Sequence, residues 1–308
     1  MTNSSAFRFD VVGMGLNAVD HICVIPRFPK YEEKLKMLDF KKAPGGQVAS
    51  ALTACAAWGL RTKYIGKVGG DELGAFSLAS LKEAGIDTAD VVTARNAMNQ
   101  FAFILVDAST GERTIIWKRD KALEMQPDQV PLTAVTSGRF LLLDGHDSEA
   151  AAVAAEHARE AGVAVVVDAE TMKPGTPALI KNSGYVVCAR EFPERFTGEA
   201  RLEEALKAIK AQGPRCVVAT LGNEGAISLD ERGFLRSKGF RVKCIDSTGA
   251  GDVFHGAFIY GLAEGWQMEA ILEFANAAAA LNCTAIGARA GIKPVGEIFD
   301  LIKHGERW

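Results

Sequence analysis

Several hallmarks of secreted, membrane and nucleic-acid-binding proteins are absent from this sequence of 308 residues. No apolar run approaches the ~20 residues that a membrane-spanning helix needs, and the N-terminal segment from Met1 to Asp10 lacks the apolar core of a signal peptide. No basic block is longer than a couple of residues and the net charge is −3, which argues against nucleic acid or an anionic membrane as a partner. We therefore expect a cytoplasmic protein.

Cysteine pairs with metal-ligand spacing are also missing. The six cysteines, at positions 23, 55, 188, 216, 244 and 283, are scattered and form no Cys-x-x-Cys motif. Most lie in apolar segments, as reduced core cysteines do, so a zinc site is not expected. Hydrophobic residues make up 48% of the sequence, which is enough for a large core. The length of 308 residues would form one large α/β domain or two smaller ones.

From residue 137 onward, apolar strand-like runs alternate with helical ones. Strands are predicted at 139–144, 163–168, 185–188 and 216–220, and helices at 148–161 and 199–211. Fully apolar strands separated by helices are typical of a parallel sheet that is covered on both faces. No linker, internal repeat or low-complexity tract interrupts the pattern, which favours a single domain over residues 1–308.

Two regions break this alternation. Residues 20–26 and 34–40 read as strands where a helix would otherwise belong, and the strands 100–107 and 112–118 flank a plausible hairpin turn that ends at Gly111. These segments, about 17–42 and 98–120, predict a small separate sheet that projects from the main domain. Because the strand at 100–107 is apolar on both faces, we expect both to be covered, one of them by a partner subunit.

The most informative motif is Asp246-Ser-Thr-Gly-Ala-Gly-Asp252. The alternating segment 240–245 before it predicts a half-buried strand, and the spacing of apolar residues after it predicts a helix. Gly249, Ala250 and Gly251 then lie on the first helical turn, where free N–H groups and the helix dipole favour a phosphate. Asp252 would take the proton from an attacking hydroxyl; the alternative is that it merely complements the helix dipole.

A second motif lies in the N-terminal half, where Pro44-Gly45-Gly46 begins a small-residue helix after Gly15-Leu-Asn17-Ala-Val-Asp20. With Thr220-Leu-Gly222-Asn-Glu-Gly225 and the glycine-flanked Asp252, these motifs resemble, in type and order, those of the ribokinase-like, or PfkB-type, carbohydrate kinases. The resemblance runs through nearly the whole chain. Gly13-Met-Gly15-Leu-Asn-Ala18 also fits a dinucleotide fingerprint, which we reject because β-branched residues and Pro26 follow it instead of a helix.

This resemblance implies a three-layer α/β/α core with a mainly parallel sheet, and a β-sheet lid that is often shared across a homodimer. It implies ATP-dependent phosphorylation of a hydroxymethyl group with Mg²⁺. The catalytic base would be Asp252, with an anion hole formed by Gly249, Ala250 and Gly251. The sugar would be bound by Asn17, Asp20, Gly45, Gly46 and Gln47. Ser50 departs from the asparagine of ribokinase and ketohexokinase.

The nucleotide and metal contacts are likewise implied by the resemblance. Thr220, Gly222 and Gly225 match the nucleotide loop, and Asn276 matches a position beside the adenine. Asp246 and the Thr248 carbonyl correspond to ligands of an activating monovalent cation, K⁺, although Gly291 replaces a serine ligand of ribokinase, which argues against that dependence. The Asn-x-x-Glu motif of many relatives is absent at 189–194, where Glu191 would reach the hydrated magnesium ion.

The identity of the sugar is the open point. Arg119, next to Lys118 at the end of a lid strand, would recognise a carboxylate, sulfonate or phosphate on the sugar, or else is a solvated strand end. The segments 251–257, 282–284 and 287–292 look closer to bacterial ketose-type kinases than to ribokinase. We expect a fructose-like or ribose-like sugar, with a neutral one favoured. The alternatives are a nucleoside (adenosine-type) kinase and a non-catalytic binding or regulatory protein of the same fold.

Overall fold

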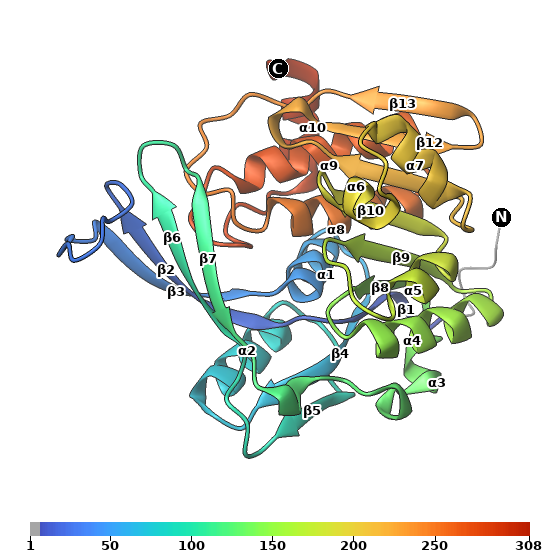
Figure 1. The fold of residues 1–308 in the computed structure, drawn as a ribbon, viewed down its shortest axis with the longest axis horizontal. Helices are drawn as coiled ribbons and strands as arrows, with labels where there is room; N and C mark the ends of the chain where they lie inside the picture. Colours follow the sequence, from blue (N-terminus) through green and yellow to red (C-terminus); the bar gives the residue numbers. More distant parts are fainter. Residues whose placement is uncertain (1–6) are drawn as a thin grey trace.

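The computed structural model describes residues 7–308, which form two β-sheets and the helices around them. A nine-stranded sheet lies between two layers of helices, and a four-stranded sheet projects from it, in blue and green at the left of Figure 1. The predicted three-layer α/β/α core with a mainly parallel sheet is confirmed. No helix within residues 7–308 is long and apolar enough to span a membrane.

The large sheet has the strand order β13-β12-β11-β10-β9-β8-β1-β4-β5. Its neighbours run parallel from β11 to β5, whereas β12 and β13 join one edge in antiparallel fashion. The strands are β1 (Phe9–Met14), β4 (Thr62–Gly69), β5 (Val91–Ala94), β8 (Gly138–Asp144), β9 (Ala164–Ala169), β10 (Tyr185–Ala189), β11 (Cys216–Thr220), β12 (Ala226–Asp230) and β13 (Gly233–Ser237).

Two apolar layers cover this sheet, because successive side chains of a strand point to opposite faces. Val11 of β1 packs in one layer and Val12 in the other. The first layer contains α1 (Gln47–Ala57), α2 (Glu72–Glu83), α8 (Ala250–Ala263), α9 (Met268–Asn282) and α10 (Val295–His304). The second contains α3 (Leu132–Val135), α4 (Ser148–Glu160), α5 (Thr176–Lys181), α6 (Phe192–Thr197) and α7 (Leu202–Lys210).

The small sheet has the order β3-β2-β6-β7, with bounds Asp39–Gly45, Ala18–Ile25, Phe101–Asp107 and Arg113–Lys118. The predicted strand at 34–40 is wrong, since β3 begins only at Asp39 and pairs with β2 up to Gly45. The pairing with β2 ends near Leu38, whose N–H donates to the Val24 carbonyl at 2.8 Å, and residues 33–37 join no strand. Ala102, Ile104 and Val106 of β6 are buried on the inner face of this sheet.

The tip of the β6–β7 hairpin touches the loop that leads into α8. The predicted turn is confirmed, with Gly111 in the left-handed region at φ 72°. The Ser247 N–H and hydroxyl both donate to the Gly111 carbonyl at 3.3 Å, and Arg113 donates to the Ser247 hydroxyl at 2.8 Å. The predicted strand at 240–245 is wrong: apart from one bridge between Phe240 and Arg307, this segment joins no ladder.

Candidate active site

Two adjoining cavities lie beside the first turn of α8. The larger, of about 480 Å³, is enclosed by the inner face of the small sheet and by the loops that follow β1, β8 and β9. The smaller, of about 290 Å³, lies between the loop after β11, the segment before α8, and α9. Thr220 and Gly251 line both cavities, so the first turn of α8 separates and connects them.

The start of α8 is shaped by glycine. Gly249 is the N-cap residue with φ 75°, and a Cβ on it would lie 2.3 Å from the Ala288 carbonyl oxygen. Only glycine fits such a close approach in a left-handed conformation. The structure brings Gly249, Gly251 and Asp252 to the wall of the large cavity and Ala250 to that of the small one. Free N–H groups of a first helical turn therefore lie between the two cavities.

Asp252 lies in an environment that disfavours its charge. Burial, and then the nearby Asp168 carboxylate, raise the pKa of Asp252 to about 8. Burial lowers the pKa of His255, whose Nδ1 lies 2.6 Å from the Gly251 carbonyl and whose Nε2 lies 3.4 Å from Asp168. Nε2 also lies 3.3 Å from the Val187 carbonyl, and carbonyls can only accept, so the shorter contact to Gly251 favours the proton of a neutral imidazole on Nδ1. A carboxylate with a raised pKa at an anion-binding turn is suited to accept a proton.

Asp168 and Glu170 are site residues that sequence reasoning missed. Asp168 lies near the carboxyl end of β9 and Glu170 directly follows the strand. The Gln47 amide donates to both, at 3.2 Å to Asp168 and 2.9 Å to Glu170. Burial, together with the Glu170 and Asp144 charges, raises the pKa of Asp168 well above its ordinary range. The sequence did contain a signal for Asp168. Ligands bind at the carboxyl ends of parallel strands, and Asp168 ends the strand predicted at 163–168.

The predicted sugar-binding residues of the N-terminal half come together around Asp20. A Cβ on Gly45 would lie 2.1 Å from the Asp20 carboxylate, and Gly46 has φ 90°. Burial raises the pKa of Asp20 to about 6, although the Arg289 guanidinium opposes this shift. Within residues 7–308 the buried Asn17 side chain has no hydrogen-bond partner for either its oxygen or its nitrogen. These groups are the donors and acceptors that a polyol needs.

Arg289 is a third residue to which the sequence analysis gave no role. Its guanidinium donates to the Gly45 carbonyl at 2.6 Å and to the Ser50 hydroxyl at 3.2 Å. Burial lowers the pKa of Arg289 to about 10, against the opposing effects of the Asp20 and Asp252 carboxylates. Arg289 therefore links the loop after α9 to the start of α1 and gives Ser50 a structural partner.

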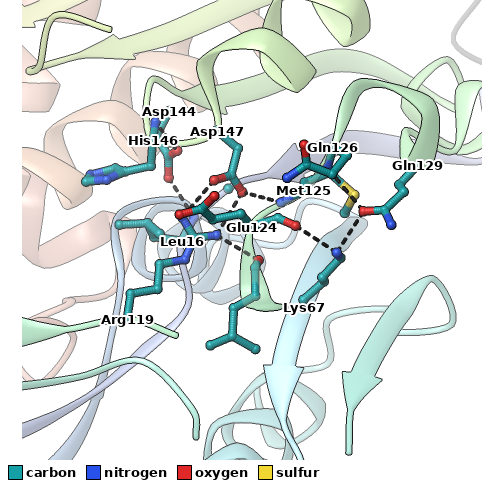
Figure 2. Close-up of polar contacts among 12 residues, drawn as sticks. Leu16, Lys67, Arg119, Glu124, Met125, Gln126, Gln129, Asp144, His146 and Asp147 are labelled. Atoms are coloured by element: carbon teal, nitrogen blue, oxygen red, sulfur yellow. Dashed lines mark hydrogen bonds and ion pairs between the residues drawn. The ribbon is translucent and has the colours of Figure 1, made fainter. Parts of the chain in front are cut away.

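Arg119 does not lie where an anion receptor would have to be. Figure 2 shows its guanidinium turned toward Asp147, to which it donates two hydrogen bonds of 2.8 and 2.7 Å. A third hydrogen bond goes to the Leu123 carbonyl. Arg119 lines a separate small pocket of about 10 Å³ and does not line the large cavity. The prediction that Arg119 binds the sugar is thus corrected: the residue anchors the end of β7.

The segment from Asp144 to Asp147 also holds the start of β2. The Leu16 N–H, just before β2, donates to the Asp144 carboxylate at 2.6 Å, and the His146 N–H donates to it at 3.1 Å (Figure 2). Asp144, the last residue of β8, and Asp147, in the loop after it, thus hold two strands at the same end of the small sheet. This loop also brings His146 to the wall of the large cavity.

The predicted nucleotide residues line the smaller cavity. Thr220, Gly222, Gly225 and Asn276 all lie on its wall, together with the aromatic rings of Phe240 and Trp308. Residues 222–224 form a 3₁₀ turn, η3, and a Cβ on Gly225 would lie 2.0 Å from the Ser237 carbonyl oxygen. The Asn276 amide donates to the Ser237 carbonyl at 3.1 Å. The cavity thus combines apolar walls with a few fixed polar groups, as small-molecule sites do.

Of the predicted metal residues, Asp246 and Thr248 lie together, since the Thr248 N–H donates to the Asp246 carboxylate at 2.8 Å, whereas Glu191 lies apart from them. Glu191 is exposed at the N-cap of α6 and lines neither cavity, whereas Asp246 is fully buried and Thr248 lines the large one. Residues 7–308 hold no cluster of three or more His, Cys, Asp or Glu side chains arranged for a metal. Magnesium that is held mainly by phosphates and waters needs only one or two carboxylates, and Asp168 and Glu170 are the pair nearest to this description.

Comparison with known proteins identifies the family. The model of the pfkB family of carbohydrate kinases matches residues 9–294. The chain belongs to this family. This carbohydrate kinase is therefore a phosphotransferase that acts on a sugar. It is similar to the ribokinase of Haemophilus influenzae, with 29% identity over 300 residues that cover 94% of this chain and 97% of that protein.

Further relatives give the same assignment without a single substrate. The 5-dehydro-2-deoxygluconokinase of Bacillus subtilis is 26% identical over 318 residues, covering 96% of each chain. A crystal structure of a ribokinase candidate from Agrobacterium tumefaciens superposes with a TM-score of 0.89 at 26% identity, covering 96% of this chain and 97% of that one. The structure of Arabidopsis thaliana ribokinase complexed with ribose and ATP has a TM-score of 0.82 at 24% identity, covering 96% and 99%, and shows the shared fold.

Replacing Arg119 tests its role as an anchor. Arg119 and Asp147 are each only 13% exposed, so Arg119→Ala leaves a largely buried carboxylate without its partner. We expect the free energy of unfolding to fall by about 3 kcal/mol in urea titrations. The matched control is Arg61→Ala, which breaks a similar pair with Asp10 in which Arg61 is 53% exposed, and should cost less than ~1 kcal/mol. Unchanged stability with a selective loss of anionic sugars would restore the receptor hypothesis.

The raised pKa of Asp252 predicts a pH-dependent cost in stability. In the unfolded chain the group ionises near its ordinary pKa of 3.8, and in the folded protein only near pH 8. Below pH 4 the group is protonated in both states and does not lower the free energy of unfolding. As pH rises to about 8, the unfolded chain releases the proton and the folded protein does not, so the free energy of unfolding falls. Relative to wild type, Asp252→Asn should become more stable over this range, by at least ~1 kcal/mol at pH 8. Thermal unfolding of both proteins at several pH values measures this difference in stability. The control is Asp128→Asn, at an exposed residue, whose stability relative to wild type should not change over the same pH range.

Proposed function

We propose that this carbohydrate kinase transfers the terminal phosphate of ATP to a hydroxymethyl group of a neutral ribose- or fructose-like sugar. The observation that carries the proposal is the composition of the large cavity. Asp252 and the glycine turn of α8 lie at one end of it, and hydrogen-bonding groups from Asp20 and Gln47 lie along its wall. A phosphate at the turn and a sugar hydroxyl beside Asp252 would be adjacent in this arrangement.

The charge of the cavity favours a neutral sugar over an anionic one. Four carboxylates line it, namely Asp20, Asp168, Glu170 and Asp252. Among its described lining residues Arg113 is the lone arginine or lysine, and its guanidinium already donates to Ser247. A carboxylate or phosphate on the sugar would lie among four acidic side chains and one arginine in a partly desolvated space, where an unpaired negative charge is costly. Sugar hydroxyls, in contrast, can donate to these carboxylates.

The chemistry follows from the positions of these groups. Asp252, with a pKa near 8, accepts the proton of the sugar hydroxyl as that oxygen attacks the phosphorus. The N–H groups at the start of α8 stabilise the negative charge on the transferred phosphoryl group. The bond from the phosphorus to the leaving ADP oxygen breaks, and ADP leaves on the side of the smaller cavity.

Nucleotide and magnesium binding are part of the same proposal. The adenosine of ATP would occupy the smaller cavity beside Asn276, with its phosphates directed along Gly222 and Gly225 toward Gly251. Asp168 and Glu170 would hold the hydrated magnesium, which neutralises phosphate charge when it is bound. This function is supported by a structural relative from Escherichia coli whose crystal structure is described as a complex with ATP and Mg²⁺.

We also propose a homodimer that forms through the outer face of the small sheet. Phe40, Phe103 and Ile116 lie on this face and are between 45% and 58% exposed. The His21 ring stacks between Phe40 and Phe103, with centroids 6.0 and 5.2 Å away. A contiguous aromatic face on a projecting sheet is suited to pack against a second copy of itself, and this would keep the sheet covered on both sides.

The kinase proposal is tested with ATP, Mg²⁺ and a panel of sugars. ADP release should appear with ribose or a ketose such as fructose, and be weak with gluconate-type acids and with adenosine. Asp252→Asn should retain ATP binding and lose ~10²–10⁴-fold in turnover, because it has the same shape without the base. Activity confined to an acidic sugar would overturn the neutral assignment, and a fully active Asp252→Asn would remove this residue from the mechanism.

The dimer is tested by placing a charge on the outer face of the small sheet. Ile116→Glu should convert the protein from dimer to monomer in sedimentation experiments, because a carboxylate cannot be buried there without a partner. Val92→Glu, at a residue that is 53% exposed on the edge strand β5, is the matched control and should remain dimeric. A monomeric wild type would contradict the proposal.

A further inference from the structure

Two loops meet beside the first turn of α8. Residues 246–249 lead into the helix, and residues 287–291 follow α9. Asp246 connects them, since its buried carboxylate accepts the Thr248 N–H and the Gly287 N–H, each at 2.8 Å. The carbonyl of Ala288 packs directly against Gly249 of the anion-binding turn. The position of that turn thus depends on how these two loops are held together.

Asn282, the last residue of α9, bridges the same two loops with its side chain. It is fully buried, and its amide nitrogen donates to the carbonyls of Thr248 and Ala288, both at 3.1 Å. Its amide oxygen accepts the Gly291 N–H at 3.2 Å. Both donors and the acceptor of this amide are therefore used between the loops. Sequence reasoning gave Asn282 no role.

These residues do not fit a bound monovalent cation. The Thr248 carbonyl, which would have to coordinate the ion, already accepts an amide N–H whose partial positive charge would face that ion. A side-chain ligand at position 291 is also excluded, because a Cβ on Gly291 would lie 2.3 Å from the Asn282 carbonyl oxygen. A serine there would require a shift of the end of α9.

We propose that the Asn282 amide takes the place of an activating cation, so that this enzyme transfers phosphate at its full rate without potassium. Asn282 is a positioning residue: it contacts neither sugar nor nucleotide, and it acts by holding Thr248 and Ala288 against Gly249. Because the amide is part of the chain, the order of the anion-binding turn does not depend on salt composition. The inference rests on the proposed kinase activity for the activity measurement in each of its two tests, but not for the melting temperatures.

The first test compares salts of equal ionic strength. Wild-type activity with the best sugar of the panel should agree within about twofold between potassium chloride and tetramethylammonium chloride, a difference smaller than the loss of one hydrogen bond. Activation by potassium of about tenfold or more would overturn the inference. The melting temperature of wild type should be equally insensitive, and this measurement needs no sugar and no turnover.

The second test uses Asn282→Asp, which keeps the shape and the acceptor for Gly291 but removes both donors. Two carbonyls and the nearby Asp246 would then face a new carboxylate, which creates a demand for a cation. In tetramethylammonium chloride we expect activity to fall by about tenfold or more, the effect of losing two buried hydrogen bonds. Potassium chloride should restore most of it and raise the melting temperature of this variant alone.

Controls separate the possible outcomes. Asn182→Asp, at a half-buried residue after α5 that lines neither cavity, should respond to the two salts as wild type does. If Asn282→Asp does not fold in either salt, Asn282→Ala provides the same comparison with a cavity that a cation can enter. Full activity of either Asn282 variant without potassium would overturn the inference. If no sugar is phosphorylated at all, the proposed function fails, whereas the melting temperatures still decide the role of Asn282.

Discussion

The parallel alignment of the central strands is the constraint on which the site depends. Because β1, β8, β9, β10 and β11 run the same way, their carboxyl ends and the loops that follow them meet at one edge of the sheet. The N-terminus of α8 points at the same edge and contributes the one turn with free N–H groups beside Asp252. Residues that are more than two hundred positions apart, such as Asp20 and Asp252, are thereby brought to one cavity.

This concentration of acidic groups has an energetic cost. Asp20, Asp168 and Asp252 all have raised pKa values, mainly because burial disfavours their charged forms. Arg289 offsets only part of the effect, and its own pKa is lowered by burial. The folded protein therefore tolerates unfavourable electrostatics that bound ligands would relieve. Sites of this kind gain stability when the charges are removed and lose function with them.

The sequence predicted those parts of the molecule whose signals are local. Helix α8, its glycine turn and the alternation of β6 follow from short-range patterns, and the structure bears out all three. The segment 240–245 alternates like a strand, but beyond the bridge from Phe240 to Arg307 it pairs with no strand, which no local pattern reveals. Arg119 failed for a related reason, since its partner Asp147 lies 28 positions away and only the fold brings them together. Asn282 and Asp168 were missed because their partners belong to other loops. The roles assigned to Asp20, Asp252 and the nucleotide residues remain predictions.

The contact between the β6–β7 hairpin and Ser247 has a consequence for how two ligands would influence one another. Gly111 at the hairpin tip rests on the loop that borders the smaller cavity, while the strands of the same hairpin form a wall of the larger one. A ligand in either cavity that shifts this hairpin changes the free energy of binding in the other. By thermodynamic linkage the effect is equal in both directions. The contacts of Gly111 and Arg113 with Ser247 therefore couple the two halves of the site.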